Sequence, residues 1–256
     1  MSLKDKVIIV TGGTSGIGEG CSRHFAACGA RVVMSSNQSE PGQRLEQELK
    51  AAGRDATFVF ADVANEESVA ALIRRTVELH GRIDGVHCNA GVWAAGKVTD
   101  FDDAVWNKVM NVNVKSVFLT AKHAIPVMEA RGKGVIVITT SVAAFVGFPK
   151  HSLYCASKAA LDALIRCLAT DHAGWLRVAG VCPGTIDTPM LAATCEGWDK
   201  PVAELYAEVA KRIPVRRLGT PADVAQAAAF LLSDAAGYIN GSSILLDGGT
   251  MALPPW

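Results

Sequence analysis

Seven short runs rich in β-branched residues alternate along the chain with longer stretches that repeat apolar residues at helical spacing. The runs span residues 7–10, 31–36, 57–61, 85–88, 135–140, 177–182 and 243–246. Helices are expected at residues 16–28, 41–52, 66–80, 103–130, 152–172 and 221–235. Because strands joined through helices pair in parallel and are covered on both sides, the pattern predicts an α/β fold, a doubly wound seven-stranded parallel sheet with helices on both faces.

The length of 256 residues fits one α/β domain, and we expect a single domain over residues 1–256. The least regular stretch, residues 188–217, contains Pro189, Pro201 and Pro214. Because such a segment between ordered elements is often a lid over a binding site, we predict a substrate lid here. An ordinary surface excursion is the alternative.

The balance of charge argues against nucleic acid and membrane partners. The 25 basic and 25 acidic residues cancel, so nothing attracts the chain to nucleic acid or to an anionic membrane surface, and a small-molecule partner is favoured. No stretch approaches the about 18 to 20 apolar residues of a membrane span. Residues 1–6 also lack the features of a secretory signal, and we expect a cytoplasmic protein.

The seven cysteines occur singly, without a Cys-x-x-Cys pair and without a histidine at ligand spacing. Single cysteines in apolar segments are typical of reduced, buried thiols. The sequence therefore predicts no metal site.

A cluster of glycines lies between the first predicted strand and the first predicted helix. Glycines let the backbone turn tightly and let a pyrophosphate approach the free amides at the start of the helix. The position after the first strand favours dinucleotide binding over a simple tight turn. The spacing is Gly-x-x-x-Gly-x-Gly, and the predicted cofactor contacts are Gly12, Thr14, Ser15, Gly16, Ile17 and Gly18.

Tyr154 and Lys158 lie four residues apart in a predicted helix, which places a phenol next to an ammonium group on one face. A phenol titrates near pH 10, and a nearby positive charge favours its ionised form. Tyr154 is therefore a candidate for proton transfer. Taken alone, such a pair more often forms a solvated helix face.

Four motifs occur together in one order: residues 11–18, Asn89-Ala90-Gly91, Tyr154 to Lys158, and Pro183-Gly184. With these motifs the chain resembles the classical short-chain dehydrogenase/reductase family over essentially its whole length. The resemblance implies a Rossmann fold, a bound NAD or NADP, and an enzyme that interconverts a secondary alcohol and a ketone. It also implies a homotetramer.

The resemblance assigns four catalytic residues. Ser141 lies thirteen residues before Tyr154, as in the family, and would hold the substrate oxygen together with the tyrosine hydroxyl. Lys158 would lower the pKa of Tyr154 and hydrogen-bond the nicotinamide ribose. Asn113 matches the asparagine that holds a water against the lysine; Asn111 is a nearby competitor that the family spacing disfavours.

Residues after the third, fourth and sixth strands match further cofactor positions in the family. Asp62 would face the adenine amino group, although it is also placed to cap a helix. Thr188 would contact the nicotinamide carboxamide. The full set of these residues is Asp62, Val63, Asn89, Ala90, Gly91, Pro183, Gly184, Ile186 and Thr188, together with Tyr154 and Lys158.

The end of the second strand leaves the choice of cofactor open. A carboxylate there binds the adenosine ribose and repels a 2′-phosphate. Ser36 occupies that place, and Asn37 occupies the place where relatives that bind the phosphate often carry arginine. NAD and NADP are therefore evenly balanced.

The predicted substrate side is mostly apolar, which favours a ketone or secondary alcohol over a polyanion. Its residues are Ser141, Val92, Trp93, Ala143, Phe145, His151, Met190, Leu191 and Trp198. Two alternatives remain beside an alcohol dehydrogenase or ketoreductase. One is an NADPH-dependent 3-oxoacyl-thioester reductase that works with an acyl carrier protein, and the other is a catalytically silent nucleotide-binding regulator.

Overall fold

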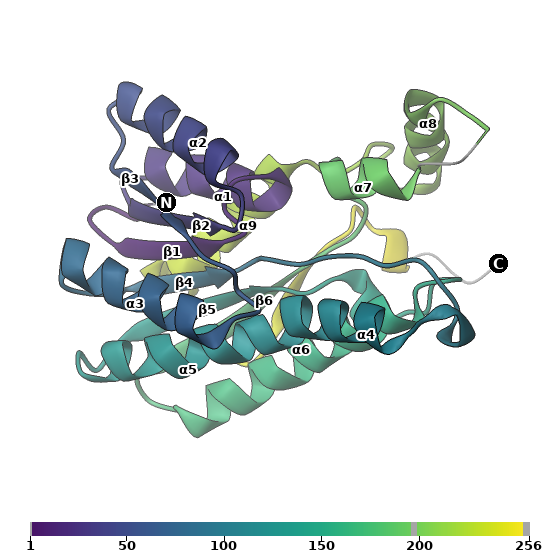
Figure 1. Ribbon diagram of the computed structural model, residues 1–256. Coiled ribbons are helices and arrows are strands. Elements are labelled where there is room, and N and C mark those ends of the chain that lie inside the picture. The colour runs from purple at the N-terminus through teal and green to yellow at the C-terminus, as the bar shows by residue number, and fades with distance from the viewer. Residues whose placement is uncertain (1, 196–198, 253–256) are drawn as a thin grey trace.

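The computed structural model describes residues 2–195 and 199–252. Within them, seven strands form one parallel sheet in the order β3-β2-β1-β4-β5-β6-β7 (Figure 1). The strands are β1 Val7–Thr11, β2 Arg31–Ser36, β3 Ala56–Phe60, β4 Gly85–Cys88, β5 Gly134–Thr139, β6 Leu176–Pro183 and β7 Ser243–Leu246. The predicted sheet is confirmed.

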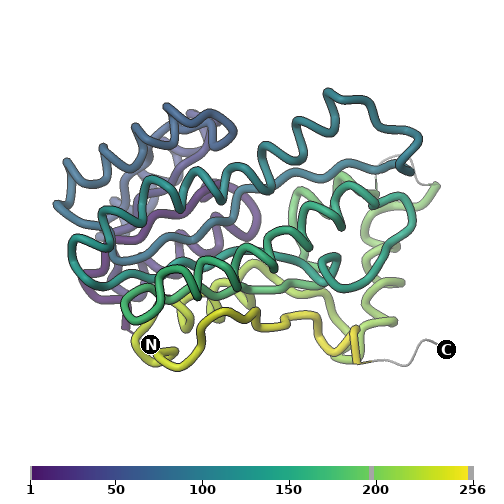
Figure 2. The backbone as a smooth tube through the Cα atoms, turned by 90° about the horizontal axis from the view of Figure 1, so that it is seen from below, coloured from purple at the N-terminus to yellow at the C-terminus, as the bar shows by residue number. Residues whose placement is uncertain are grey.

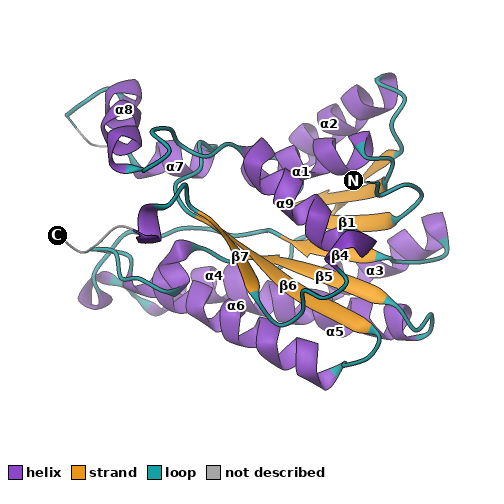
Figure 3. Ribbon diagram, turned by 180° about the vertical axis from the view of Figure 1, so that it is seen from behind, coloured by secondary structure: helices purple, strands orange, loops and turns teal. Residues whose placement is uncertain are grey.

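Helices cover both faces of the sheet (Figures 1 and 3). They are α1 Gly16–Ala27, α2 Ser39–Ala51, α3 Glu66–His80, α4 Asp103–Met110, α5 Ser116–Glu129, α6 Ser152–Asp171, α7 Pro189–Thr194, α8 Val202–Arg212 and α9 Pro221–Leu232. Short turns complete the set: η1 Val98–Asp100, the π-helical η2 Asn111–Lys115, η3 Val142–Ala144, η4 Asp234–Ala236 and η5 Thr250–Ala252. None of the helices in the described residues is long and apolar enough to cross a membrane.

Two apolar clusters hold the layers together. One joins α1, α2 and α9 to the sheet and includes the fully buried Phe25. The other joins α3, α5 and α6 to the opposite face and includes Ile136 and Leu161. Because the central strands are covered on both sides, as predicted, β1, β4 and β5 are buried along their whole length.

The bounds of most predicted elements differ from the structure by one to three residues, and three differences concern the segments around the site. Strand β5 ends at Thr139, one residue before its predicted end, so Ser141 lies two residues beyond the strand. The expected helix 103–130 is interrupted by η2, where the backbone takes the wider π-helical turn. The irregular stretch 188–217 contains α7 and α8, because Pro189 is the first residue of α7 and Pro201 immediately precedes α8, positions where proline starts helices.

The strand order reverses between β1 and β4, so the connections after these two strands leave in opposite directions. In open α/β sheets, such a switch point makes a crevice at the carboxyl ends of the strands. Figures 1 and 2 place α7 and α8 at this end of the molecule.

Charged side chains form hydrogen bonds and ion pairs at the opposite end of the sheet, where the strands begin. Asp84, just before β4, accepts hydrogen bonds from the Val7 backbone N–H at 2.8 Å, from Arg82 at 2.9 Å and from Arg131 at 2.6 Å. Burial by itself raises the pKa of Asp84, but these donors outweigh it and hold the pKa below its ordinary value.

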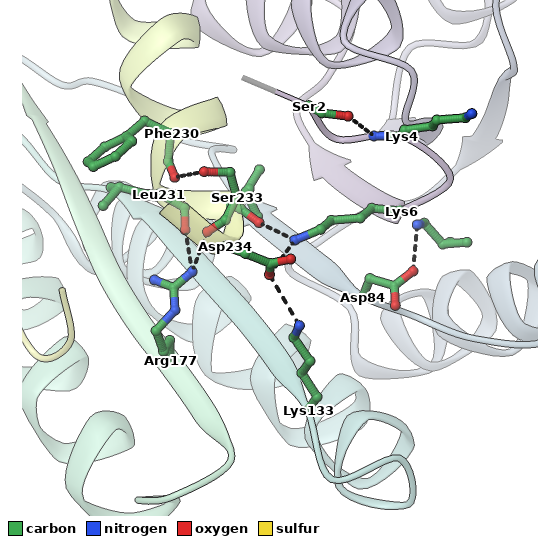
Figure 4. A network of polar contacts seen from close by, with 12 residues as sticks. Ser2, Lys4, Lys6, Asp84, Lys133, Arg177, Phe230, Leu231, Ser233 and Asp234 are labelled. Carbon is green, nitrogen blue, oxygen red and sulfur yellow. Dashed lines mark hydrogen bonds and ion pairs between the residues drawn. The ribbon is translucent and has the colours of Figure 1, made fainter. Parts of the chain in front are cut away.

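Further ion pairs lie beside Asp84 (Figure 4). Asp234 binds Lys6 at 3.0 Å and Lys133 at 3.1 Å. Arg177 donates to the carbonyl oxygens of Leu231, at 2.7 Å, and Ser233, at 3.0 Å, where α9 ends. These contacts fix the edge of the sheet that lies away from the crevice.

Replacing Asp84 by Asn should lower the free energy of unfolding by about 1 to 3 kcal/mol at neutral pH, because the amide cannot accept from all three donors. A carboxylate whose folded pKa is depressed stabilises the fold above its unfolded pKa, and this contribution is lost as the pH falls through the folded pKa. The difference in the free energy of unfolding between the parent and the variant should therefore be constant near neutrality and become smaller below about pH 4. Urea unfolding across this range measures it.

The exposed Asp171, at the end of α6, offers a control, because Asp171→Asn removes a carboxylate without these partners. An Asp84→Asn variant as stable as the parent near neutrality would contradict the assignment.

Candidate active site

A cavity of about 320 Å³ opens over the carboxyl ends of the central strands. Its wall comes from the glycine loop, from the segments after β4 and β5, from α6, and from the segment that runs from β6 into α7. Lining residues are Gly12, Ser15, Gly16, Ile17, Asn89, Ala90, Gly91, Trp93, Thr139, Thr140, Ser141, Val142, Ala143, Phe148, His151, Tyr154, Lys158, Pro183, Gly184, Thr185, Ile186, Thr188, Pro189, Met190, Leu191 and Thr194.

The glycine loop after β1 forms one end of this cavity. Gly12 has a φ of +61°, a conformation that favours glycine. A Cβ atom on Gly18 would lie 1.9 Å from the Gly12 carbonyl oxygen, so α1 can start this close to the loop only with glycine there. Ser15 precedes α1 without capping its N–H groups through its side chain, which leaves amides and a positive helix end free for an anion. The loop therefore fits a dinucleotide pyrophosphate.

Ser141 and Tyr154 line the same cavity. Ser141 precedes η3, and its Oγ accepts a hydrogen bond from the Ala143 N–H at 3.2 Å. The Ser141 hydroxyl still has its own proton, which it donates toward the Tyr154 oxygen and can turn to the oxygen of a bound ligand. Tyr154 lies in the first turn of α6, next to Ser141.

Lys158 is buried one turn further along α6. Its Nζ donates to the Thr139 carbonyl oxygen at 2.9 Å and lies 5.7 Å from the centroid of the Tyr154 ring. Burial lowers the pKa of Lys158 to about 8.

The expectation that Lys158 lowers the pKa of Tyr154 is not met in this structure. Burial raises the pKa of Tyr154 to about 12, and a hydrogen bond with Ser141 opposes this only in part. The ammonium group lies over the ring and bonds a backbone oxygen, so loss of hydration dominates at the hydroxyl.

Asn113 lies in η2 and is fully buried. Its Oδ1 accepts from the Val92 N–H at 2.7 Å, and its Nδ2 donates to the Val92 carbonyl at 2.9 Å and to Ser157 Oγ at 3.0 Å. Ser157 in turn donates to the Tyr154 carbonyl at 2.8 Å. The side chain of Asn113 thus ties the segment after β4 to the catalytic turn of α6.

Most of the predicted cofactor residues line the cavity, but six do not. Thr14 and Gly18 lie within the glycine loop and its junction with α1, where they support it. Ser36 ends β2 and Asn37 follows it, and Ser36 Oγ accepts from the Gln38 N–H at 3.1 Å. Asp62 and Val63 follow β3; Asp62 Oδ1 accepts from the Ala64 N–H at 3.0 Å, and Asn65, not Asp62, caps α3.

On the substrate side, Trp93, Ala143, His151, Met190 and Leu191 line the cavity as expected. Phe145 and Val92 are not part of the lining, and the Phe145 side chain is 53% exposed. Trp198 lies outside the described residues.

Sequence reasoning missed several lining residues. Thr139, Thr140 and Val142 flank Ser141, and their position at the end of β5 was a usable signal. Phe148 and Thr194 had no such signal, because a loop and a short helix bring them to the cavity.

The fold and the glycine loop at the switch point define a dinucleotide-binding protein of the Rossmann type. The model of the family described as enoyl-(acyl carrier protein) reductase matches residues 12–251. An uncharacterized oxidoreductase of Thermotoga maritima is 38% identical over 99% of this chain and 100% of its own. The 2-(S)-hydroxypropyl-CoM dehydrogenase 3 of Xanthobacter autotrophicus is 37% identical over 98% of both chains.

Among solved structures, a gluconate 5-dehydrogenase of Burkholderia cenocepacia in complex with NADP and tartrate superposes with a TM-score of 0.90 at 28% identity, covering 99% of this chain and 98% of that one. The chain belongs to the classical short-chain dehydrogenase/reductase family. It is an NAD(P)-dependent oxidoreductase of the alcohol dehydrogenase and ketoreductase type.

Proposed function

We propose that the protein interconverts a secondary alcohol and a ketone by hydride transfer with NAD(P), and that Tyr154 is its acid and base. One observation supports this most strongly. Ser141, Tyr154 and the buried Lys158 line the same cavity as the glycine loop. Two donors beside a cation suit an oxygen that gains negative charge.

The glycine loop and the start of α1 would hold the pyrophosphate, and Ile186 and Thr188 would border the nicotinamide end. When bound, the nicotinamide ring supplies or accepts the hydride. Ser141 donates its hydroxyl proton to the substrate oxygen and orients it. Tyr154 gives a proton to the ketone oxygen or removes one from the alcohol.

Lys158 would supply positive charge to the site as the substrate oxygen gains negative charge, since its pKa of about 8 keeps it largely protonated near neutrality. Asn113 positions the catalytic turn through Ser157 and the Tyr154 carbonyl. No described residue group forms a metal site, and none of these roles requires one.

A hydride-absorbance screen tests the proposal. Secondary alcohols and ketones, cyclic and open-chain, are assayed with NAD(H) and NADP(H) in parallel. We expect turnover of compounds whose carbinol carbon bears apolar groups that suit Trp93, Phe148 and Met190. Dinucleotide binding without turnover of any alcohol or ketone would favour a silent regulator, and turnover confined to acyl thioesters with NADPH would favour the carrier-protein reductase.

The cofactor preference depends on the end of β2. Replacing Ser36 by Asp should shift the ratio of kcat/KM for NAD over NADP upward by at least about tenfold, because a carboxylate binds the ribose and repels the 2′-phosphate. Ser36→Asn is the matched control, since it has the same shape without the charge. Equal ratios in the Asp and Asn variants would place the ribose elsewhere.

The segment 188–217 is proposed as a substrate lid on a single domain. Leu205 is the buried residue of α8, which projects beyond the sheet in Figures 1 and 3, while α7 contributes Met190 and Leu191 to the cavity. A helix with so little buried surface can move at low cost. Hydrogen exchange in α7 and α8 should slow when cofactor and substrate bind.

Assembly and location extend the proposal. Phe118 on α5 and Leu245 on β7 are each about half exposed, which supports a homotetramer built through α5, α6, α9 and β7. Light scattering measures the mass of the assembly.

The seven free cysteines support a reducing compartment such as the cytoplasm.

A further inference from the structure

A polar pair lies within the apolar layer between the sheet and α1. His87 of β4 is fully buried, between Val10 of β1 and Val137 of β5 in the strand register. Its ring centroid is 5.9 Å from that of Phe25, and its Nε2 is 2.8 Å from Thr139 Oγ1. An apolar pair would fill this space without the cost of removing two polar groups from water. The presence of these two polar side chains in an apolar layer therefore needs a physical explanation.

The contacts of Asn89 determine which group donates in the hydrogen bond between His87 and Thr139. Asn89 Nδ2 faces the carbonyl oxygens of Thr11, at 3.3 Å, and Gly12, at 3.4 Å, so its Oδ1 must be the acceptor that faces Thr139. Thr139 Oγ1 gives its single proton to that oxygen at 3.3 Å. The 2.8 Å contact with His87 then requires a proton on Nε2.

A neutral imidazole meets this requirement. Burial lowers the pKa of His87 to about 3, so the ring carries one proton near neutrality. With that proton on Nε2, Nδ1 is left as an acceptor, and it has no partner among the described residues. The ring thus acts as a donor at one end of a chain that runs from His87 through Thr139 and Asn89 to the glycine loop.

This chain of hydrogen bonds ends at the glycine loop, where the dinucleotide would bind. Gly12 has a positive φ, lines the cavity and carries the carbonyl that the start of α1 approaches closely at Gly18. Thr139 also serves the catalytic side, because its carbonyl oxygen accepts from Lys158 Nζ at 2.9 Å. Thr139 therefore contacts both Asn89, which holds the glycine loop, and the buried Lys158.

We propose that His87 is a positioning residue for dinucleotide binding: its Nε2–H orients the Thr139 hydroxyl, this orients the Asn89 amide, and the amide holds the carbonyls of Thr11 and Gly12 in place. The inference rests on binding of the dinucleotide at the glycine loop and is independent of which substrate is turned over.

The test measures the Kd of NAD and NADP by isothermal titration calorimetry on the full chain, together with Tm and kcat. Replacing His87 by Leu should raise the dinucleotide Kd about three- to tenfold, the effect of one neutral buried hydrogen bond. The change should appear in Kd and in the KM for the dinucleotide more than in kcat at saturating dinucleotide. Gln at position 87 can present a donor near the place of Nε2 and should recover most of the affinity.

Thr139→Val removes the hydroxyl with little change in shape, so it tests the same chain if the Leu variant folds poorly. The double variant should be no weaker than the worse single variant, because both changes break one chain. Val86→Ala removes apolar atoms from the opposite face of β4 and should lower Tm while leaving Kd unchanged.

Two results would overturn the proposal: a Kd for His87→Leu within twofold of the parent value while Tm falls, and additive losses in the double variant. The first would make His87 a packing residue only. If the parent protein binds a dinucleotide but turns over no alcohol or ketone, the proposed reaction fails while this test still gives an answer.

Discussion

Replacement of Tyr154 by Phe should lower kcat by about 10²- to 10⁴-fold, the usual contribution of a positioned acid or base. The ring remains, so the packing of α6 and the contact with Lys158 remain, and only the hydroxyl is lost. The dinucleotide Kd should stay within about threefold of the parent value, because the phosphate cradle is untouched. The loss should therefore appear in kcat rather than in binding.

Tyr238 provides the control, since its side chain is fully exposed and distant in sequence from the site. Tyr238→Phe should leave kcat, KM and the dinucleotide Kd unchanged. If Tyr154→Phe keeps more than a tenth of the parent turnover, Tyr154 is not the proton donor, and the proposed mechanism would need another acid.

Gly18→Ala should have the second large effect, a rise of about a hundredfold or more in the dinucleotide Kd. The new Cβ would lie 1.9 Å from the Gly12 oxygen and 2.6 Å from Asn89 Nδ2, so α1 and the loop must move apart. Neither neighbour is the end of a long flexible chain that can swing away. Overpacking of this kind also costs about 1 to 3 kcal/mol of stability.

Gly237→Ala is the matched control, because Gly237 has helical φ and ψ and an added Cβ meets only the Asp234 oxygen at 3.4 Å. Calorimetric titration with NAD and NADP separates the two variants. If the Gly18→Ala protein binds either dinucleotide as tightly as the parent, the glycine loop is not the site that binds the pyrophosphate.

The fold was accessible from the sequence because its signals are local. A buried parallel strand needs an apolar run, and a crossover helix needs an apolar stripe, so each element is encoded by its own residues. The interruption of 103–130 by η2 was not accessible, since it accompanies the bonds between Asn113 and Val92, twenty-one residues apart. The helices of 188–217 were missed because Pro189 and Pro201 were interpreted as breaks rather than starts.

The site divides in the same way. Tyr154 and Lys158 are neighbours on one helix, and Ser141 follows a strand at a recognisable spacing, so a motif could propose them together. Their electrostatics could not be proposed correctly. Lys158 turns toward the Thr139 carbonyl, and burial, which depends on every surrounding element, raises the pKa of Tyr154 instead of lowering it.

By itself, the sequence determined the sheet, the glycine loop and the residue types that carry the chemistry, because each depends on spacings within one element or at one junction. The tertiary structure alone decided which face His87 occupies, what Asn113 holds and which loops close the cavity. Those contacts join residues from different strands and helices, and hydrogen-bond direction and burial exist only once these elements are packed together.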